Sequence, residues 1–228
     1  MIEVFCRPHR TQTGADISEV AKVIGMDHRI GNKFLNASVG FGGSCFKKDI
    51  LNLVYLCQTY GLDEVAAYWH SVVKINEYQQ ERFTSNILSR MFNTLADKRI
   101  CLFGFAFKAN TSDTRESPAI NIARNLLEER AQVIITDPQA LSRARQDLAG
   151  LAGTVEYIDD PYEAAAGCDA IAVMTEWNLY RDLDYERILK TMNRPAFIFD
   201  GRNLLDHQAL FEMGFNVFPI GKPALSHY

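Results

Sequence analysis

The stretch Arg99-Ile-Cys-Leu-Phe-Gly-Phe105 reveals the architecture of this chain more clearly than any other. It is a continuous apolar run that contains Gly104, and such a run is typical of a strand that is buried on both faces of a sheet. Ser117 and Pro118 follow as an N-cap and a first helical residue, so a helix is expected over 119–130. The stretch therefore predicts a buried strand that leads into a helix.

The same rhythm continues to the end of the chain. Further strands are expected over 132–136, 155–158, 169–174, 196–199 and 215–218, and further helices over 141–148, 162–166, 185–192 and 207–213. Strands that alternate with helices through short loops predict a parallel, doubly wound sheet. No strand is followed by G-x-G-x-x-G, so these 228 residues contain no dinucleotide fingerprint.

The first part of the chain is expected to be helical. Helices are predicted over 14–25 and 46–60, and helical apolar spacing then continues over 62–94 without proline or glycine. A helix of that length suits a bridge between domains, and two shorter helices broken near 76–78 are the alternative. The predicted fold class is α/β: a helical central region, 1–94, joined by the long helix to a Rossmann-like domain, 95–228. No role is assigned to residues 1–13.

Composition excludes several classes of function. The formal net charge of −4 gives no basis for binding nucleic acid or an anionic membrane. No apolar run approaches the roughly 20 residues that span a bilayer, and residues 1–13 lack the apolar core of a secretory signal. Five cysteines without framework spacing fit a reducing cytoplasm. No C-x-x-C or H-x-x-x-H spacing occurs, so no metal site is predicted.

The stretch Val39–Asp49 contains the candidate nucleophile. Cys45 follows two glycines and Ser44, precedes Lys47 and Lys48, and stands where a helical pattern begins. A helix N-terminus and nearby ammonium groups favour an anion, and the thiolate is the reactive form of cysteine. The alternative is that Cys45 is a small buried hydrophobe, which is the interpretation that we give to the other four cysteines.

Three cations follow the expected carboxyl ends of strands, where ligands of doubly wound sheets bind. Lys108 and Arg115 come after the first strand, and Arg202 comes after the fifth. If they meet at one edge they form an anion site that suits a diphosphate. The alternative is that each is a separate solvated charge on a loop.

Several motifs together resemble the UDP-glucose/GDP-mannose dehydrogenase family, in particular the central and C-terminal parts of its UDP-glucose 6-dehydrogenases. The resemblance covers residues 14–222. The stretches that carry it are 25–34, 39–49, 104–108 with Thr111, Asp113, Arg115, Glu116 and Ser117, then 175–177 and 199–202. The long helix resembles the interdomain and dimer helix of the family, which implies a homo-oligomer, a dimer or larger.

The resemblance implies that UDP-glucose is oxidised twice at C6, with NAD as the hydride acceptor, to give UDP-glucuronate. Cys45 matches the family's nucleophile, whose sulfur adds to the aldehyde. The thiohemiacetal that forms is the donor of the second hydride. Asp49 matches a carboxylate that assists the thiol and water steps. Both residues are therefore expected to be catalytic.

The resemblance also assigns binding residues. Arg29 matches an arginine that reaches the substrate of a neighbouring subunit, and Lys48 and Arg115 match contacts to NAD. The remaining substrate-binding positions are Ala37, Ser38, Val39, Gly40, Phe41, Gly42, Phe107, Lys108 and Arg202.

The family's N-terminal NAD-binding domain has no counterpart in this sequence, so we expect a truncated chain that is inactive alone. One alternative is a non-catalytic module that binds UDP-sugar or pairs with full-length subunits. Another is an unrelated α/β nucleotide binder that shares these motifs by chance.

Overall fold

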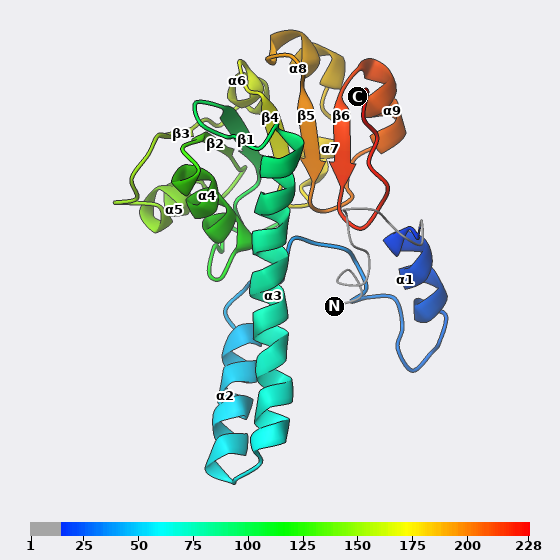
Figure 1. Cartoon of the computed structure of the whole chain (residues 1–228), viewed down its shortest axis with the longest axis vertical. Coiled ribbons are helices and arrows are strands. Elements are labelled where there is room, and N and C mark those ends of the chain that lie inside the picture. Colours follow the sequence, from blue (N-terminus) through cyan, green and yellow to red (C-terminus); the bar gives the residue numbers. More distant parts are fainter. Residues whose placement is uncertain (1–14) are drawn as a thin grey trace.

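The computed structural model describes residues 15–228 and contains one six-stranded parallel sheet (Figure 1). The strands are β1 Arg99–Phe103, β2 Gln132–Thr136, β3 Val155–Tyr157, β4 Ala170–Val173, β5 Phe197–Asp200 and β6 Asn216–Pro219. Their order is β3-β2-β1-β4-β5-β6, with β1 paired to β2 and β4. This is the order of a doubly wound nucleotide-binding sheet, so the predicted fold class is confirmed.

Short helices connect the strands. They are α4 Pro118–Glu128, α5 Leu141–Asp147, α6 Pro161–Ala165, α7 Asn178–Arg181, α8 Tyr185–Thr191 and α9 His207–Met213. Ser117 caps α4 as predicted, because its hydroxyl accepts a hydrogen bond from the Ala119 N–H, and Asp184 caps α8 in the same way. Only the four-residue helix α7 was not predicted.

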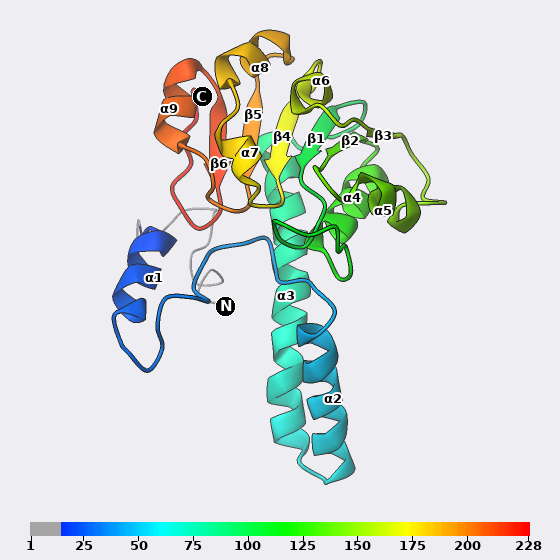
Figure 2. The ribbon, with the colours of Figure 1, turned by 180° about the vertical axis from the view of Figure 1, so that it is seen from behind.

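Both faces of the sheet are buried, which explains the continuous apolar runs. Ile100 and Leu102 face the cluster that also contains residues of α3, α4 and α5. Cys101 and Phe103 face the opposite cluster, which contains residues of α6, α8 and α9. Figure 2 shows this second face, with α7 in front of the strands. Because side chains alternate along a strand, one short run supplies both cores.

The long helix α3, Asp63–Arg90, is unbroken, so the alternative of two shorter helices is wrong. Its first half pairs with α2, Phe46–Thr59, in a hairpin that projects from the sheet (Figure 1). Its second half covers the sheet, with Ile87 and the C-cap residue Met91 fully buried. The helix ends at Arg90 rather than 94 because Phe92 and Asn93 adopt positive φ angles.

The helix α1, Ile17–Gly25, lies beside the carboxyl edge of the sheet (Figure 1). It begins three residues later than predicted because the carboxylate of Asp16 accepts a hydrogen bond from the Ser18 N–H, at 2.7 Å, and caps it. Gly14, Cys6 and the segment 1–13 lie outside the described residues. Among the residues described, no helix combines the length and the hydrophobicity that a bilayer crossing requires.

Gly104 joins β1 to the loop that follows it, at the carboxyl edge of the sheet. A substitution there tests how closely this edge is packed. Its φ is +98°, and a Cβ there would lie 2.4 Å from the side chain of Thr175. We expect Gly104→Ala to lower the free energy of unfolding by about 3 kcal/mol, because backbone strain and overpacking combine. Urea unfolding measures this change.

Gly150→Ala is the matched control, since Gly150 has a φ of +82° and no atom within 4 Å of the added Cβ. Strain alone predicts a loss of about 1 kcal/mol there. Equal losses in the two variants would contradict the close contact at Gly104.

Candidate active site

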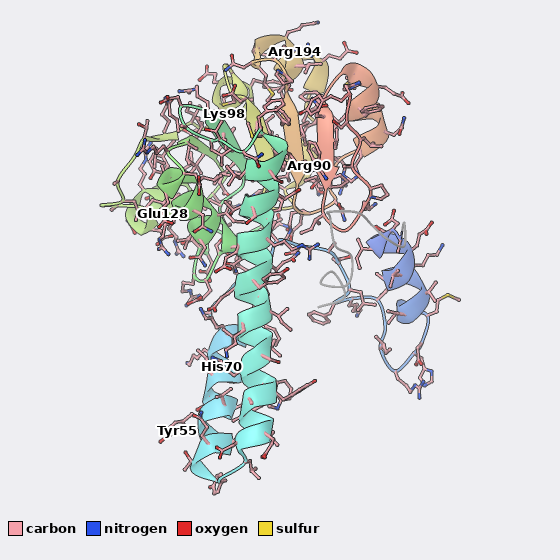
Figure 3. The ribbon with its side chains drawn as sticks, in the orientation of Figure 1. Tyr55, His70, Arg90, Lys98, Glu128 and Arg194 are labelled. Carbon is pink, nitrogen blue, oxygen red and sulfur yellow. The ribbon has the colours of Figure 1, made fainter. Side chains whose placement is uncertain are left out.

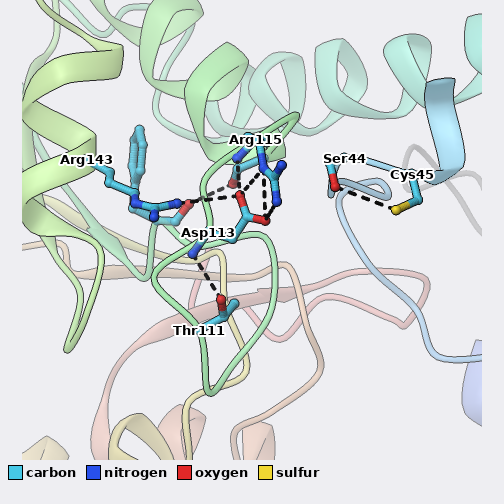
Figure 4. A network of polar contacts seen from close by, with 8 residues as sticks. Ser44, Cys45, Thr111, Asp113, Arg115 and Arg143 are labelled. Atoms are coloured by element: carbon cyan, nitrogen blue, oxygen red, sulfur yellow. Dashed lines mark hydrogen bonds and ion pairs between the residues drawn. The ribbon is translucent and has the colours of Figure 1, made fainter.

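Cys45 lies at the position expected for a nucleophile. It is the N-cap of α2, its carbonyl accepts a hydrogen bond from the Asp49 N–H at 2.8 Å, and its thiol is exposed. The Ser44 hydroxyl lies 3.6 Å from its sulfur (Figure 4). Asp49 follows one helical turn later and is also exposed. The structure therefore brings the two expected catalytic residues together at the start of one helix.

The other described cysteines have the surroundings of buried hydrophobes. Cys57, Cys101 and Cys168 are all buried free thiols. Burial raises the pKa of Cys101 well above its ordinary value, which keeps this thiol neutral. Cys45 is the one exposed thiol between residues 15 and 228.

Two glycines allow the loop before Cys45 to pack against the loop that follows β1. The Gly43 N–H donates to the carbonyl of Arg115 at 2.9 Å. A Cβ on Gly42 would lie 2.5 Å from the Glu116 carbonyl oxygen, and one on Gly43 would lie 3.0 Å from the ring of Phe107. The glycines thus hold Phe107 and Arg115 beside the candidate nucleophile.

Lys47 connects three parts of the site. Its ammonium forms ion pairs with Glu116, at 3.0 Å, and with Glu77 of α3, at 3.7 Å. Sequence spacing did not predict these pairs, because the partners lie far apart along the chain. Lys48, the expected cofactor contact, is exposed on the first turn of α2.

Arg202 lies at the carboxyl end of β5 and reaches the loop before Cys45. Its backbone N–H donates to the carboxylate of Asp200, and its guanidinium donates to the Ser38 hydroxyl at 3.1 Å. It also forms an ion pair with Glu176, which follows β4. The Ser38 hydroxyl donates to the carbonyl of Gly40 at 2.7 Å. Two expected substrate-binding residues, Ser38 and Arg202, are therefore in direct contact.

Arg115 is held by Asp113 through a bidentate contact of 2.6–3.1 Å (Figure 4). Hydrogen bonds from Arg115 lower the pKa of Asp113 from its ordinary 3.8 to about 2. Asp113 in turn raises the pKa of Arg115, and the charge of a Cys45 thiolate adds a smaller increase. Arg143, which the sequence analysis did not single out, lies 3.8 Å from Asp113.

The three cations expected at the strand ends thus have different partners. Arg202 contacts Ser38 and Glu176, Arg115 contacts Asp113, and the Lys108 ammonium lies 5.4 Å from the centre of the Phe107 ring. Arg29 pairs with Asp27 on the segment that follows α1, away from the α2–α3 hairpin (Figure 1).

Two buried carboxylates organise the loops of this edge. Asp137 accepts hydrogen bonds from the Phe105 and Ala106 N–H groups and from the Trp177 indole. Asp200 accepts from the Leu205 N–H, and His207 lies 2.9 Å away. Sequence analysis did not assign them this role, although an acidic residue that directly follows a buried strand is a recognisable signal.

Two sequence models of one family match this chain. The central domain of the UDP-glucose/GDP-mannose dehydrogenase family matches residues 7–78, and the UDP-binding domain of that family matches residues 101–207. The chain belongs to this family. The matched segments include the loop of Cys45 in the central domain and the strand ends that carry Lys108 and Arg202 in the UDP-binding domain.

Curated relatives named UDP-glucose 6-dehydrogenase are about half identical to the chain. One from Oryza sativa is 50% identical over 95% of this chain and 48% of its own length, and one from Drosophila melanogaster is 51% identical over 92% and 46%. The solved UDP-glucose dehydrogenase of Pyrobaculum islandicum has a TM-score of 0.74 and 32% identity over 89% of this chain and 45% of its own. The chain spans about half the length of these relatives.

The effect of Arg115 on the pKa of Asp113 can be measured. Arg115→Ala is expected to raise the pKa of Asp113 from about 2 towards 3.8, because it removes the main donors to the carboxylate. Carboxyl-carbon NMR titration measures this value. Since the folded pKa is lowered, the pair stabilises the fold above pH 3.8, and this contribution is lost as the pH falls towards 2.

Arg143→Ala is the matched control, because Arg143 lies farther from Asp113 and makes the smallest contribution. It should move the titration of Asp113 less than Arg115→Ala does. An unchanged Asp113 titration in Arg115→Ala would show that the bidentate contact is absent in solution.

Proposed function

We propose that this chain supplies the nucleophile and the UDP-sugar site of an NAD-dependent UDP-glucose 6-dehydrogenase. The observation that carries the proposal is the exposed thiol of Cys45 at the start of α2, on a loop that packs against the carboxyl edge of the sheet. The relatives named UDP-glucose 6-dehydrogenase support the choice of substrate.

The proposed reaction oxidises the sugar in two steps. The C6 alcohol loses a hydride to a first NAD and a proton to a base, which leaves an aldehyde. The Cys45 sulfur adds to the aldehyde carbon, and the oxygen takes a proton to form a thiohemiacetal. This carbon loses a second hydride to a second NAD, and the oxygen loses its proton, which leaves a thioester. Water displaces the sulfur and yields the carboxylate and the free thiol.

The described residues have separate proposed roles. Asp49 assists the proton steps at the thiol and at water, because it follows Cys45 by one helical turn. The loop 37–42 presents its backbone to the uridine diphosphate, and Lys108 and Arg202 supply positive charge to the phosphates and the sugar. Phe107 packs beside the nucleotide, and Arg29 reaches the substrate of a neighbouring subunit.

NAD, when bound, accepts the two hydrides. Lys48 and Arg115 are the residues that we propose to contact it, and both are exposed, which suits a contact with a large anionic cofactor. These 228 residues contain no glycine fingerprint for a dinucleotide, so we propose that they do not hold the nicotinamide without a further domain. A reducing cytoplasm suits a reaction that needs Cys45 as a free thiol.

A second candidate function rests on the α2–α3 hairpin. Large apolar side chains are exposed along it, and Tyr55 extends away from α3 into solvent (Figure 3). They are Phe46, Leu51, Tyr55, Leu56, Tyr60, Leu62, Val65, Tyr68 and Tyr78. Exposed large apolar side chains that gather on one element are typical of a protein interface. We propose that a second copy of the hairpin covers it, so that the chain also acts as a dimerisation module.

The test of the catalytic proposal is the reactivity of Cys45. Iodoacetamide at pH 7 is expected to label Cys45 faster than a model thiol, because its sulfur is exposed at the start of a helix, where negative charge is stabilised. UDP-glucose should slow this labelling. Peptide mass spectrometry identifies the labelled residue, and Cys45→Ser removes the signal while Cys57→Ser keeps it.

Labelling no faster than a model thiol would remove the physical basis of the nucleophile. With UDP-glucose and NAD, the same chain should release little or no NADH, since hydride transfer requires the nicotinamide within about 3–3.5 Å of C6. Turnover of about 1–10³ per second would show that the chain binds NAD productively without a further domain.

The dimerisation proposal is tested by changing the hairpin surface. Light scattering should show a dimer or larger, and Leu51→Asp should shift the chain towards a monomer, because it places a charge in the interface. Leu179→Asp is the matched control, as Leu179 is 47% exposed on α7 and Leu51 is 41% exposed on α2. A monomeric parent chain, or equal effects of both changes, would contradict the proposal.

A further inference from the structure

Three side-chain amides lie on consecutive turns of α3 and face the loop that precedes Cys45. Asn76, Gln79 and Gln80 are 9%, 6% and 4% exposed, in the middle of the longest helix of the described chain. Buried amides are costly unless their donors and acceptors are paired. Their partners therefore show what this part of the helix does.

Asn76 makes two hydrogen bonds to one residue of the loop. Its Oδ1 accepts from the Phe41 N–H at 2.8 Å, and its Nδ2 donates to the Phe41 carbonyl at 3.1 Å. One side chain thus satisfies both backbone polar groups of Phe41, as a neighbouring strand would. A Cβ on Gly40 would lie 2.8 Å from Asn76 Oδ1, so the loop passes directly over the amide.

The neighbouring amides extend this contact on both sides. Gln79 donates to the carbonyl of Ser38 at 3.4 Å, close to where Arg202 reaches the loop. Gln80 accepts from the side chain of Asn121 on α4 at 2.7 Å. The amides therefore connect the loop to α3 and to a helix that covers the sheet.

Phe41, whose backbone Asn76 holds, also contacts the start of α2. Its ring packs edge-on against the ring of Phe46, with 4.7 Å between centroids, and Phe46 is the residue after Cys45. A residue that holds the Phe41 backbone therefore also fixes the start of the helix on which Cys45 stands. Asn76 therefore acts on Cys45 through the position of α2, and not through a contact with the thiol.

We propose that Asn76 is a positioning residue for the nucleophile and for the loop 37–42. The inference rests on the function proposed above. An amide is required because the Phe41 backbone needs both an acceptor and a donor. An aspartate in place of Asn76 would keep the acceptor but set negative charge against the Phe41 carbonyl, and an alanine would leave both groups of Phe41 unpaired.

The experiment compares Asn76→Asp and Asn76→Ala with Thr84→Ala in this 228-residue chain. Thr84 is a buried residue of the same helix whose hydroxyl bonds to the Gln80 carbonyl, away from the loop. Hydrogen exchange of the Phe41 N–H is expected to be about tenfold faster in Asn76→Ala, which removes its acceptor, and less changed in Asn76→Asp, which keeps that acceptor and loses only the donor to the Phe41 carbonyl. The rate of Cys45 alkylation and the affinity for UDP, measured by calorimetry, should both fall several-fold, while Thr84→Ala changes neither.

Thermal unfolding of each variant separates positioning from general loss of stability. If Thr84→Ala lowers Tm as much as Asn76→Ala but leaves alkylation and UDP affinity unchanged, the positioning role stands. If alkylation of Cys45 is unchanged in both Asn76 variants, the proposal is overturned. Should the parent chain fail to bind UDP, the proposed function fails, and the alkylation rates still decide the role of Asn76.

Discussion

The continuity of α3 is the constraint on which the candidate site depends. One half of this helix packs on the sheet through Phe83, Ile87 and the C-cap residue Met91, and the other half supports α2. Val39, in the loop before Cys45, is fully buried in the same cluster as these three residues. A single rigid element therefore relates the candidate nucleophile to the edge where the cations stand, and a break in the helix would uncouple them.

The edge itself is ordered by two buried carboxyl groups that several hydrogen-bond donors surround. Asp137 follows β2 and Asp200 ends β5. They are 2% and 0% exposed and accept hydrogen bonds from loop backbone groups. A carboxyl group that is this deeply buried is tolerated because several hydrogen-bond donors surround it. These bonds define the paths of the loops that carry Phe107 and Arg202, so the side chains of the edge start from fixed backbones.

The sequence predicted best those features that residues close together in the chain determine. Strand and helix bounds followed from apolar runs and caps such as Ser117, because neighbouring residues determine them. The helix α7 was missed since four residues give no periodicity. The contacts of Arg202 with Ser38 and Glu176 join segments far apart in the chain, and no spacing rule relates them. The placement of Cys45 at a helix start was predictable, but its support by Asn76 was not.

Both arginines of the edge are already paired with carboxylates, Arg115 with Asp113 and Arg202 with Glu176, and this affects how an anion could bind. Arg115 is oriented by Asp113, and Lys47 is compensated by Glu77 and Glu116. A guanidinium has five N–H donors, so it can keep its carboxylate and still donate to a phosphate. Each arginine is then held in a defined position before a ligand arrives, which reduces the entropy lost on binding. An ammonium such as that of Lys47 has no planar fork to share in this way. The arginines, rather than Lys47, are therefore the groups of this edge best suited to a diphosphate.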